Sequence, residues 1–388
     1  MIQFTINREQ LSRELKFLQK RIIRNKKVNT ENVELYVEGQ ILGLRVGSLV
    51  ETGNEVIPTY TSTFATIINQ EGHGITTSVY LKKFNQLVAK LKDGFLSIEI
   101  EPEVSITIKT KKNKYSLPLE SAFESPELDL ENAMRLTFKS CELKSIFEKL
   151  LKFVSTDDMK PNFNGVFMHR RNNKLSICAT DAHKLSVIDI DSEGEDFNLL
   201  LHTSSVKAVL SLLEAKSEAL TTLEISENLY DFKFSFRGYE VTSKGMNERF
   251  PDYEMVIPLG RYISTFYKSD MLEAIDRLSL VCNQTTNQGK FTFKEDDITI
   301  AAEDLDFSTE GSETIDTSGD ADMTIGFNLK LLEILLKCTD KGMTTIDLTE
   351  PGYAATIREE AHGGRWTYLL MPIMLRNFLA DEDDDILA

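Results

Sequence analysis

The amino-acid sequence predicts an α+β protein built from three similar domains, each with two helices packed on an antiparallel sheet. Three amphipathic segments of similar length predict one helix in each domain: Leu81–Leu91, Ser205–Leu213 and Asn328–Leu336. The residues that precede them, Tyr80, Ser204 and Phe327, are spaced 124 and 123 residues apart. This regular spacing in a chain of 388 residues indicates an internal repeat.

Each repeat has an earlier helical segment, and short alternating strands lie between its two helices. The earlier helices are predicted at about Leu11–Ile22, Leu143–Val154 and Met271–Val281. Among the strands, Asn173–Asp181 matches Asp297–Asp304, and Gln40–Gly47 is a weaker match. Each begins at a polar pair typical of a hairpin turn, such as Asn172-Asn173. Further alternating strands are predicted at Ser97–Ile108 and Leu223–Phe236.

Two polar segments separate the repeats. Glu120–Asn132 is acidic and contains Pro126, and Gly245–Gly260 contains two prolines and two glycines. We therefore expect domains at 1–123, 124–253 and 254–375, followed by an acidic tail at 376–388.

The formal net charge of −17 is distributed unevenly along the chain. Residues 1–123 carry 17 basic and 13 acidic side chains, residues 124–258 carry 16 and 23, and residues 259–388 carry 11 and 25. The overall balance argues against nucleic acid as a partner, because DNA is itself densely negative. Net charge does not locate the charges, however, and the basic first third leaves one surface open to DNA.

The sequence contains no recognisable signature of catalysis or of metal or cofactor binding, so we expect no catalytic residues, metal or cofactor. Asp189–Gly194 begins like a calcium-binding loop, but Leu200 stands where the bidentate glutamate belongs. Ala179–Lys184 holds Thr, Asp, His and Lys, and a turn that shapes a pocket is the favoured interpretation. The four separated cysteines and the lack of a long apolar run predict a cytoplasmic protein without a membrane segment.

A basic segment runs from Arg8 to Lys27, interrupted only by Glu9 and Glu14. At helical spacing Lys16, Lys20 and Arg24 share one face. Taken alone, such a run is most often a solvated helix face. The lysines of the second helix in the same domain, at 82, 83, 90 and 92, favour contact with phosphates without reading of bases.

Several motifs together resemble the bacterial DNA polymerase III beta subunit, the beta sliding clamp. Pro161–Gly165 followed by Leu175–Leu185 is similar to the family pattern "LNG … ATDGHRL". Arg249–Pro258 is similar to "RFPDYxxVLP", and Tyr368–Leu375 is similar to the closing "YVVMPMRL". The order of the motifs fits the family, and the resemblance covers the chain through Leu375.

The resemblance implies a head-to-tail homodimer that closes into a ring of six domains, with the helices lining the hole. Such a clamp encircles duplex DNA and tethers the replicative polymerase, without catalysis of its own, and it also binds the clamp loader and other proteins. The predicted DNA contacts are Arg13, Lys16, Lys20, Arg21, Arg24, Lys26, Lys27, Lys82, Lys83, Lys90, Lys149, Lys152 and Lys207.

The resemblance also implies a cleft between the second and third domains that binds a short peptide motif of partner proteins. Matched residue by residue, its wall is predicted to consist of Phe163, Thr180, Ala182, His183, Lys184, Leu185, Pro251, Val256, Ala354, Leu369, Leu370, Met371, Pro372, Ile373, Met374 and Leu375. Ala182 stands where the family often has Gly, and Lys184 where it often has Arg. Met255 and Met374 replace residues that are commonly Arg, so we expect a more apolar cleft with a weaker grip on carboxylates.

For the ring interface, we expect the strand Lys114–Leu117 to pair with a third-domain strand of a second copy. Tyr115 and Leu117 would then meet apolar residues near Leu280 and Val281. The basic first third and the acidic last third favour this head-to-tail arrangement.

Three alternatives remain open. The chain could be a DNA-binding regulatory protein that uses Arg8–Lys27, or an enzyme with an unrecognised site near Asp181 and His183. The tail could also occupy the cleft as a weak competitor, through Phe378-Leu379 or Ile386-Leu387.

Overall fold

The computed structural model describes residues 1–21, 31–52, 55–72, 74–120, 130–157 and 159–375. Its residues form two compact units. The first contains Met1–Phe147 and Phe197–Glu248, and the second contains Glu148–Asp196 and the chain from Arg249 onward. Each unit thus combines part of the middle repeat with one terminal repeat. The domain boundaries expected from the sequence stay a prediction.

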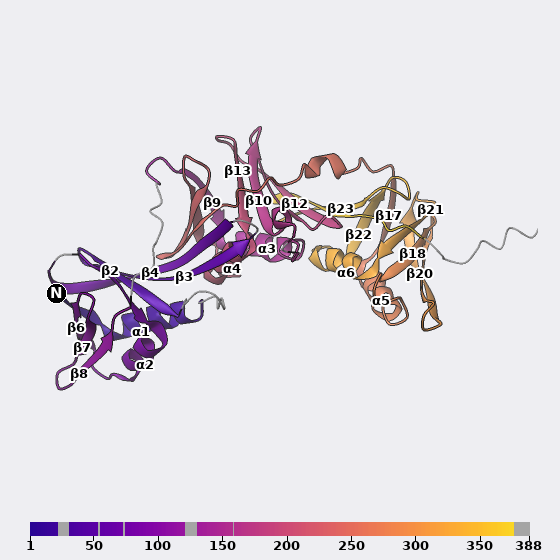
Figure 1. The fold of residues 1–388 in the computed structure, drawn as a ribbon. Helices are drawn as coiled ribbons and strands as arrows, with labels where there is room; N and C mark the ends of the chain where they lie inside the picture. Colours follow the sequence, from indigo (N-terminus) through magenta and orange to yellow (C-terminus); the bar gives the residue numbers. More distant parts are fainter. Residues whose placement is uncertain (22–30, 53–54, 73, 121–129, 158, 376–388) are drawn as a thin grey trace, which may run out of the picture. The chain divides into compact units, whose positions relative to one another are not determined.

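The first unit is organised around one antiparallel sheet with the strand order β8-β7-β6-β1-β4-β16-β15-β14-β9, in which β3 also pairs with β4 and β2 pairs with β3 and β5 (Figure 1). Its strands are β1 (Ile2–Asn7), β2 (Asn32–Glu38), β3 (Ile41–Thr52), β4 (Glu55–Glu71), β5 (Thr76–Tyr80), β6 (Phe95–Glu101), β7 (Ser105–Lys109), β8 (Lys114–Pro118), β9 (Met134–Lys139), β14 (Leu220–Ile225), β15 (Asp231–Phe236) and β16 (Tyr239–Lys244). The strand β13 (Phe197–His202) and the helix α4 (Thr203–Leu212) also belong to this unit.

The helices α1 (Arg8–Gln19) and α2 (Leu81–Lys90) pack against each other in the first unit. The Asn7 side chain begins α1 by accepting hydrogen bonds from the backbone N–H groups of Glu9 and Gln10. Both helices bury apolar residues at a spacing of three to four, and these pack into one core with the strands. Because one face of each helix is buried, their lysines and arginines are left on the outward faces.

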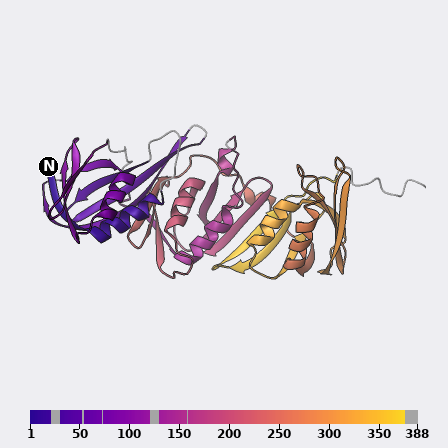
Figure 2. The same cartoon turned by 90° about the horizontal axis from the view of Figure 1, so that it is seen from below.

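The second unit has the strand order β10-β11-β12-β24-β23-β22-β17-β20-β19-β18-β21, again antiparallel throughout. Its strands are β10 (Gly165–Arg171), β11 (Lys174–Thr180), β12 (Lys184–Asp191), β17 (Tyr262–Tyr267), β18 (Gln288–Phe293), β19 (Asp297–Asp304), β20 (Thr309–Gly319), β21 (Met323–Asn328), β22 (Met343–Leu348), β23 (Ala355–Ala361) and β24 (Gly364–Leu370). The helices α5 (Lys268–Leu278) and α6 (Leu329–Cys338) lie side by side on the sheet (Figure 2). The helix α3 (Ser140–Leu150) crosses from one unit into the other, and two short 3-10 helices cover Pro161–Phe163 and Tyr253–Val256.

The six helices predicted from the sequence are confirmed among the described residues, with ends shifted by a few positions. The hairpin turn at Asn172-Asn173 is also confirmed, since both residues have positive φ angles, 52° and 59°. Two strand predictions were wrong in extent, because Ser97–Ile108 and Leu223–Phe236 each contain a hairpin. Both turns contain a residue in the left-handed region, Glu103 (φ 61°) and Leu229 (φ 58°), which ends the extended run.

Candidate nucleic-acid interface and partner cleft

The outward face of α1 forms an open groove lined mainly by basic side chains. Its lining comprises Arg8, Glu9, Ser12, Arg13, Lys16, Phe17, Lys20, Arg21 and Tyr239. Arg13, Lys16 and Lys20 are exposed, whereas Glu14 of the same helix is buried. The Glu14 carboxylate accepts hydrogen bonds from Thr63 Oγ1 at 2.8 Å and from Arg13 Nε at 2.9 Å. The one carboxylate in the middle of this helix is thus directed inward, and the cations face solvent.

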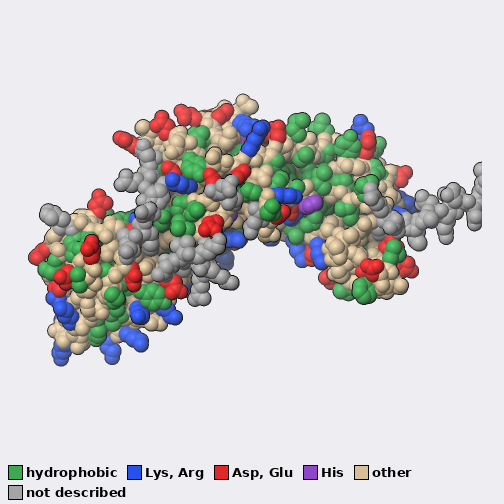
Figure 3. Space-filling model, in the orientation of Figure 1, with side chains coloured by type: hydrophobic (Ala, Val, Ile, Leu, Met, Phe, Trp, Pro, Cys, Tyr) green, Lys and Arg blue, Asp and Glu red, His purple; other side chains and the backbone are tan. Residues whose placement is uncertain are grey.

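Most of the other predicted DNA contacts in the described chain are also exposed lysines. They are Lys82, Lys83 and Lys90 of α2, Lys207 of α4 and Lys152 just after α3. Figure 3 shows Lys and Arg side chains gathered on the part of the first unit where Figure 1 places α2 and β8. The predicted contacts Arg24, Lys26 and Lys27 lie outside the described residues.

Arg21 is a predicted DNA contact that the structure directs into the protein. Its Nε donates to Ser211 Oγ at 3.0 Å, and its Nη1 donates to the Phe17 carbonyl oxygen at 2.9 Å. Burial lowers the pKa of this guanidinium. Arg21 therefore joins α1 to α4 within the first unit. Because its guanidinium is engaged in these hydrogen bonds, we do not expect it to bind DNA phosphates.

Lys149 is the second predicted DNA contact that lies inside the protein, with only 8% of its surface exposed. Its Nζ lies 2.8 Å from Asp340 Oδ2, 3.4 Å from the Tyr368 hydroxyl and 3.7 Å from Glu359 Oε1. Partial burial opposes ionisation of Asp340, yet the hydrogen bonds and charges of Lys149 and His362 hold the pKa of its carboxyl below the ordinary value. The positive charge of Lys149 is thus balanced by carboxylates of the third repeat, and we do not expect this side chain to contact DNA.

Strand pairing brings together the segments from which the partner cleft was predicted. Leu185 of β12 is paired with Leu369 of β24, and Ala355 of β23, next to Ala354, is paired with Leu370. The pairing continues past the end of β24, because the Met371 N–H donates to the His183 carbonyl oxygen at 2.9 Å. The Ile373 N–H then donates to the Gly326 carbonyl oxygen at 2.9 Å, which fixes the last described residues beside β21.

The predicted cleft residues divide into a buried and an accessible group. Thr180, Lys184, Leu185, Ala354, Leu369 and Leu370 are buried. Ala182, His183, Val256 and Met374 are exposed, and Phe163, Pro251, Met371, Pro372, Ile373 and Leu375 are half-buried. Only the accessible group offers surface to a partner, because the side chains of the buried group are covered by the protein itself. Met255, which the cleft prediction left out of the wall, is 82% exposed beside Val256.

The residues between β11 and β12 form the turn expected from the sequence, and a role of this turn in shaping a pocket stays a prediction. The Asp181 carboxylate accepts hydrogen bonds from the backbone N–H groups of His183 and Lys184, each at 2.9 Å, and pairs with the Lys184 ammonium. Ala182 has a φ of 76°, in the left-handed region where glycine is favoured. Asp181 is therefore engaged within its own turn rather than set up as a catalytic base.

The segment that follows β16 packs against β10 through aromatic residues. Phe250 stacks on Phe167 with ring centroids 4.8 Å apart, and the Tyr253 hydroxyl lies 2.9 Å from His169 Nε2. Burial raises the pKa of Tyr253 well above its ordinary range, so the hydroxyl stays protonated. These contacts hold the segment that contains Pro251 against β10.

Among the strand edges of the described chain that lack a partner strand are those of β8 and of part of β20. β8 pairs only with β7, and it exposes Tyr115 (37%) while Leu117 is half-buried. β20 pairs with β17 only through Thr317–Gly319, which leaves one edge of its earlier residues open. Near that edge Leu280 is 81% exposed and Val281 is half-buried.

The sequence reading missed two apolar residues in the turn between β19 and β20. Leu305 is 67% exposed and Phe307 is 79% exposed. The Thr309 hydroxyl donates to the Val281 carbonyl oxygen at 2.9 Å, so the turn lies beside the Leu280–Val281 segment. In the sequence, these two apolar side chains stand out because they interrupt the acidic stretch 303–310.

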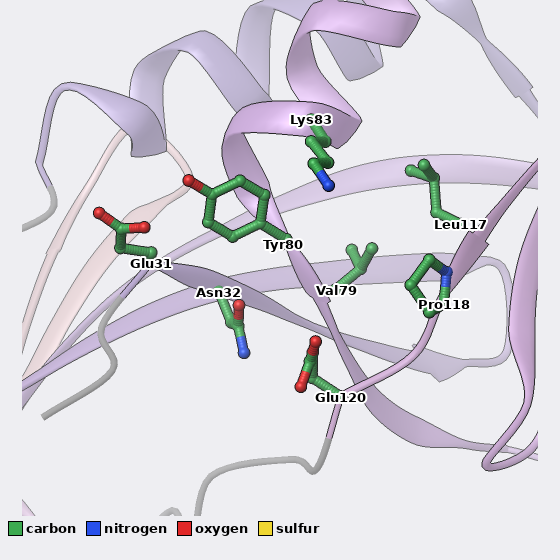
Figure 4. A pocket seen from close by; sticks show the side chains of 8 residues that line it. All are labelled: Glu31, Asn32, Val79, Tyr80, Lys83, Leu117, Pro118 and Glu120. Carbon is green, nitrogen blue, oxygen red and sulfur yellow. The ribbon is translucent and has the colours of Figure 1, made fainter.

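A pocket opens beside the carboxyl end of β8 (Figure 4). It is lined by Glu31, Asn32, Val79, Tyr80, Lys83, Leu117, Pro118 and Glu120. Figure 4 shows the Lys83 ammonium directed toward the space between Tyr80 and Leu117. The predicted interface residue Leu117 is thus one wall of a hollow that mixes apolar and charged groups.

Within the described ranges, no group of three or more His, Cys, Asp or Glu side chains is placed to hold a metal ion. No described helix has the length and apolar character that a membrane crossing requires.

Comparison with known proteins gives one consistent result. Residues 137–252 match the family model of the DNA polymerase III beta subunit central domain, and residues 256–374 match that of its C-terminal domain. The chain is 24% identical over 383 residues to the beta sliding clamp of Haemophilus influenzae, which covers 96% of this chain and 100% of that protein. It is 25% identical over 312 residues to the beta sliding clamp of Escherichia coli, covering 77% and 82%.

Solved structures have the same fold. The Pseudomonas aeruginosa DNA polymerase III subunit beta superposes with a TM-score of 0.81 at 19% identity, covering 96% of this chain and 100% of that one. The Thermotoga maritima DNA polymerase III beta subunit superposes with a TM-score of 0.77 at 19% identity, covering 97% and 100%. The predicted α+β fold class is confirmed by these likenesses.

Proposed function

The chain belongs to the bacterial DNA polymerase III beta subunit family, and from this premise we propose that it is a DNA sliding clamp. It encircles duplex DNA and tethers the replicative polymerase as a processivity factor, with no catalysis of its own. The observation that carries this proposal is the similarity to a named beta sliding clamp along the full length of that protein. Four cysteines that are free thiols fit the reducing cytoplasm in which DNA replication takes place.

DNA contact is assigned to the exposed cations of the helices. These are Arg13, Lys16, Lys20, Lys82, Lys83, Lys90, Lys152 and Lys207. Mobile lysines on an outward face can neutralise phosphates without reading base edges, and this suits a protein that must slide. Arg24, Lys26 and Lys27 extend the same basic segment and remain in the proposal. Arg21 and Lys149 are left out of it, because both are engaged in contacts inside the protein.

Ring closure is assigned to the open edge of β8 in one copy and the open edge of β20 in a second copy. Antiparallel pairing of these edges would continue the sheet from one chain into the next. Lys111, Lys112 and Lys114 lie on or next to β8, and Glu310 lies on β20, so the charges are complementary. The exposed Leu280, Leu305 and Phe307 would then be covered together with Tyr115 and Leu117.

Partner binding is assigned to the accessible residues around the end of β24. Met255 and Met374 offer exposed, flexible apolar side chains and Val256 adds a further exposed apolar one, as expected for a surface that accepts several partners. The ligand class is a short apolar peptide segment of the polymerase, the clamp loader or another clamp-binding protein.

Topological retention on DNA provides the direct test. The protein, loaded by its clamp loader, should stay on a nicked circle at a salt concentration that removes ordinary phosphate-bound proteins, and it should leave once the circle is cut. The mass in solution should be about twice the 44.0 kDa of the chain. A regulatory protein bound through Arg8–Lys27 alone would instead show the same salt sensitivity on circular and linear DNA.

A further inference from the structure

A network of charged and aromatic side chains surrounds the end of α3 in the second unit. Asp340 and Glu359 approach Lys149 Nζ to 2.8 and 3.7 Å, and the Asp340 N–H donates to the Glu359 carboxylate at 2.9 Å. Lys149 also lies over the Trp366 ring, 5.0 Å from its centroid. One helix end of the middle repeat is thus fixed to three separate segments of the last repeat.

The network continues directly into the strand that forms the cleft. Trp366 and Tyr368 are both on β24, stacked with centroids 5.5 Å apart and planes at 4°. The Tyr368 hydroxyl donates to the Cys338 carbonyl oxygen, at 3.1 Å, or to Glu359 Oε1, also at 3.1 Å. Two residues after Tyr368 the strand ends and the segment Met371–Leu375 begins.

The opposite wall of the cleft is in contact with the same cluster. Phe153, in the turn after α3, packs on the Tyr368 ring with centroids 6.0 Å apart. The buried Lys184 ammonium lies 5.8 Å from the centroid of the Phe153 ring, and Lys184 is the first residue of β12. A continuous row of contacts therefore runs from Lys149 through Tyr368 and Phe153 to the β11–β12 turn.

We propose that Lys149 is a positioning residue for the partner cleft, which holds β24 and the β11–β12 turn in register through the cluster of Asp340, Glu359, Tyr368 and Phe153. This role rests on the proposed peptide cleft. The energetic reason is that a buried ammonium is stable only where its carboxylate partners are held close, so the pair selects one arrangement of the segments that carry it. Lys149 acts through other residues and does not touch the peptide.

The chain offers a built-in reporter for this cluster. Trp366 is the only tryptophan of the protein, and it is 1% exposed in contact with Lys149. Its fluorescence therefore reports the state of the cluster without a label. Binding of a short peptide from the replicative polymerase should change this fluorescence in the wild-type dimer.

The experiment compares Lys149→Met with Lys341→Met, which removes an exposed lysine beside Asp340. Affinity for the labelled polymerase peptide should fall about tenfold in Lys149→Met and stay at the wild-type value in Lys341→Met. Lys149→Arg, which keeps the charge, should retain most of the affinity. Trp366 fluorescence should change in Lys149→Met, whereas the salt dependence of retention on circular DNA should not.

A folded Lys149→Met protein with altered Trp366 fluorescence and wild-type peptide affinity would overturn the proposal. If Lys149→Met fails to fold, as judged by circular dichroism, Asp340→Asn replaces it, because Asp340 is half exposed and tolerates neutralisation better. Asp340→Asn should weaken peptide binding about threefold, and unchanged affinity would again reject the role. A wild-type protein that ignores the peptide but still encloses circular DNA would refute the cleft, and the role of Lys149 with it, while leaving the clamp function intact.

Discussion

The Arg21 guanidinium lies against the Phe17 ring, with its central carbon 3.4 Å from the ring centroid. Tyr239 stacks on Phe17 at 3.9 Å between centroids. Two groups this close to one ring centre cannot share a face, so Phe17 is enclosed between them. Since Arg21 also donates to Ser211, the stack joins α1 to α4 and β16. A cation that sequence reasoning assigns to DNA thus serves packing within the first unit.

Replacement of Arg21 by alanine should lower the free energy of unfolding by about 2 kcal/mol. The loss combines a partly desolvated cation–π contact with hydrogen bonds from a charged donor to Ser211 and Phe17. Urea denaturation followed by circular dichroism measures the change. Lys16→Ala serves as the control on the same helix, because Lys16 is exposed and its removal should change stability by less than about 0.5 kcal/mol. Equal stability of the two variants would show that the stack contributes nothing.

Removal of Lys16 and Lys20 together should weaken DNA binding in a salt-dependent way. If each lysine neutralises one phosphate, the slope of log affinity against log salt should fall by about two. Binding of the protein to short duplex DNA, measured by fluorescence anisotropy over a range of salt, gives the slope. Lys294→Ala is the matched control, since Lys294 is exposed in the turn between β18 and β19 rather than on a helix. An unchanged slope in the double variant would exclude α1 from the DNA contact.

The sequence predicted the helices and singled out the motif segments that β12 and β24 bring together, because periodicity and sequence motifs are local properties. It could not tell which cations turn inward, because the partners that decide this are distant in sequence. Arg21 and Ser211 are 190 residues apart, and Lys149 and Asp340 are 191 residues apart. For the same reason Lys184 was predicted to line the cleft, although the structure buries its side chain.

The open edge of β20 was likewise beyond the reach of sequence reasoning. It arises because β17 pairs with β20 only through Thr317–Gly319, whereas β19 pairs along Thr309–Asp316. The alternation of side chains along residues 309–319 does not show where the pairing with β17 ends. Only once this open edge is known can the exposed Leu305 and Phe307 be recognised as candidates for an interface.

Substitution of Phe307 by serine should weaken the proposed dimer about tenfold or more, because an exposed aromatic side chain near a strand edge is a strong candidate for burial between copies. Sedimentation at several protein concentrations measures the dissociation constant. Leu259→Ser provides the control, since Leu259 is 91% exposed and precedes β17 at the end where Tyr262 pairs with Leu348 of β22. Equal dimer stability in both variants would place the interface elsewhere, and a wild-type monomer would contradict the ring itself.

Substitution of Ala182 by glycine should stabilise the protein by roughly 0.5–1 kcal/mol. The alanine φ of 76° carries the strain of the left-handed region, and relief of this strain outweighs the extra freedom that glycine has in the unfolded chain. Thermal unfolding measures the gain. Ala215→Gly, at an exposed position that has no positive φ angle, should show no gain and serves as the comparison. A loss of stability in Ala182→Gly would mean that the turn tolerates alanine without strain.

The pairing of Asp340 with Lys149 and His362 should make one part of the stability depend on pH. Because the folded protein lowers the pKa of Asp340 below its usual 3.8, the native state binds fewer protons there than the unfolded chain. The stabilisation is therefore fully present above the usual value and is lost as the pH falls through the lowered one. The groups that face Asp340 are Lys149 Nζ at 2.8 Å, His362 Nε2 at 3.0 Å and, through its backbone N–H, Glu359.

Asp340→Asn should accordingly melt below the wild type at neutral pH, and the gap should close as the pH falls below the ordinary carboxyl value of 3.8 and through the lowered one. Melting temperatures of both proteins across this range measure the gap. Asp322→Asn, at an exposed position, is the control and should follow the wild type at every pH. A gap that persists at the lowest pH would show that the variant loses packing or hydrogen bonding rather than charge. A gap that widens on acidification would contradict the sign of the shift at Asp340.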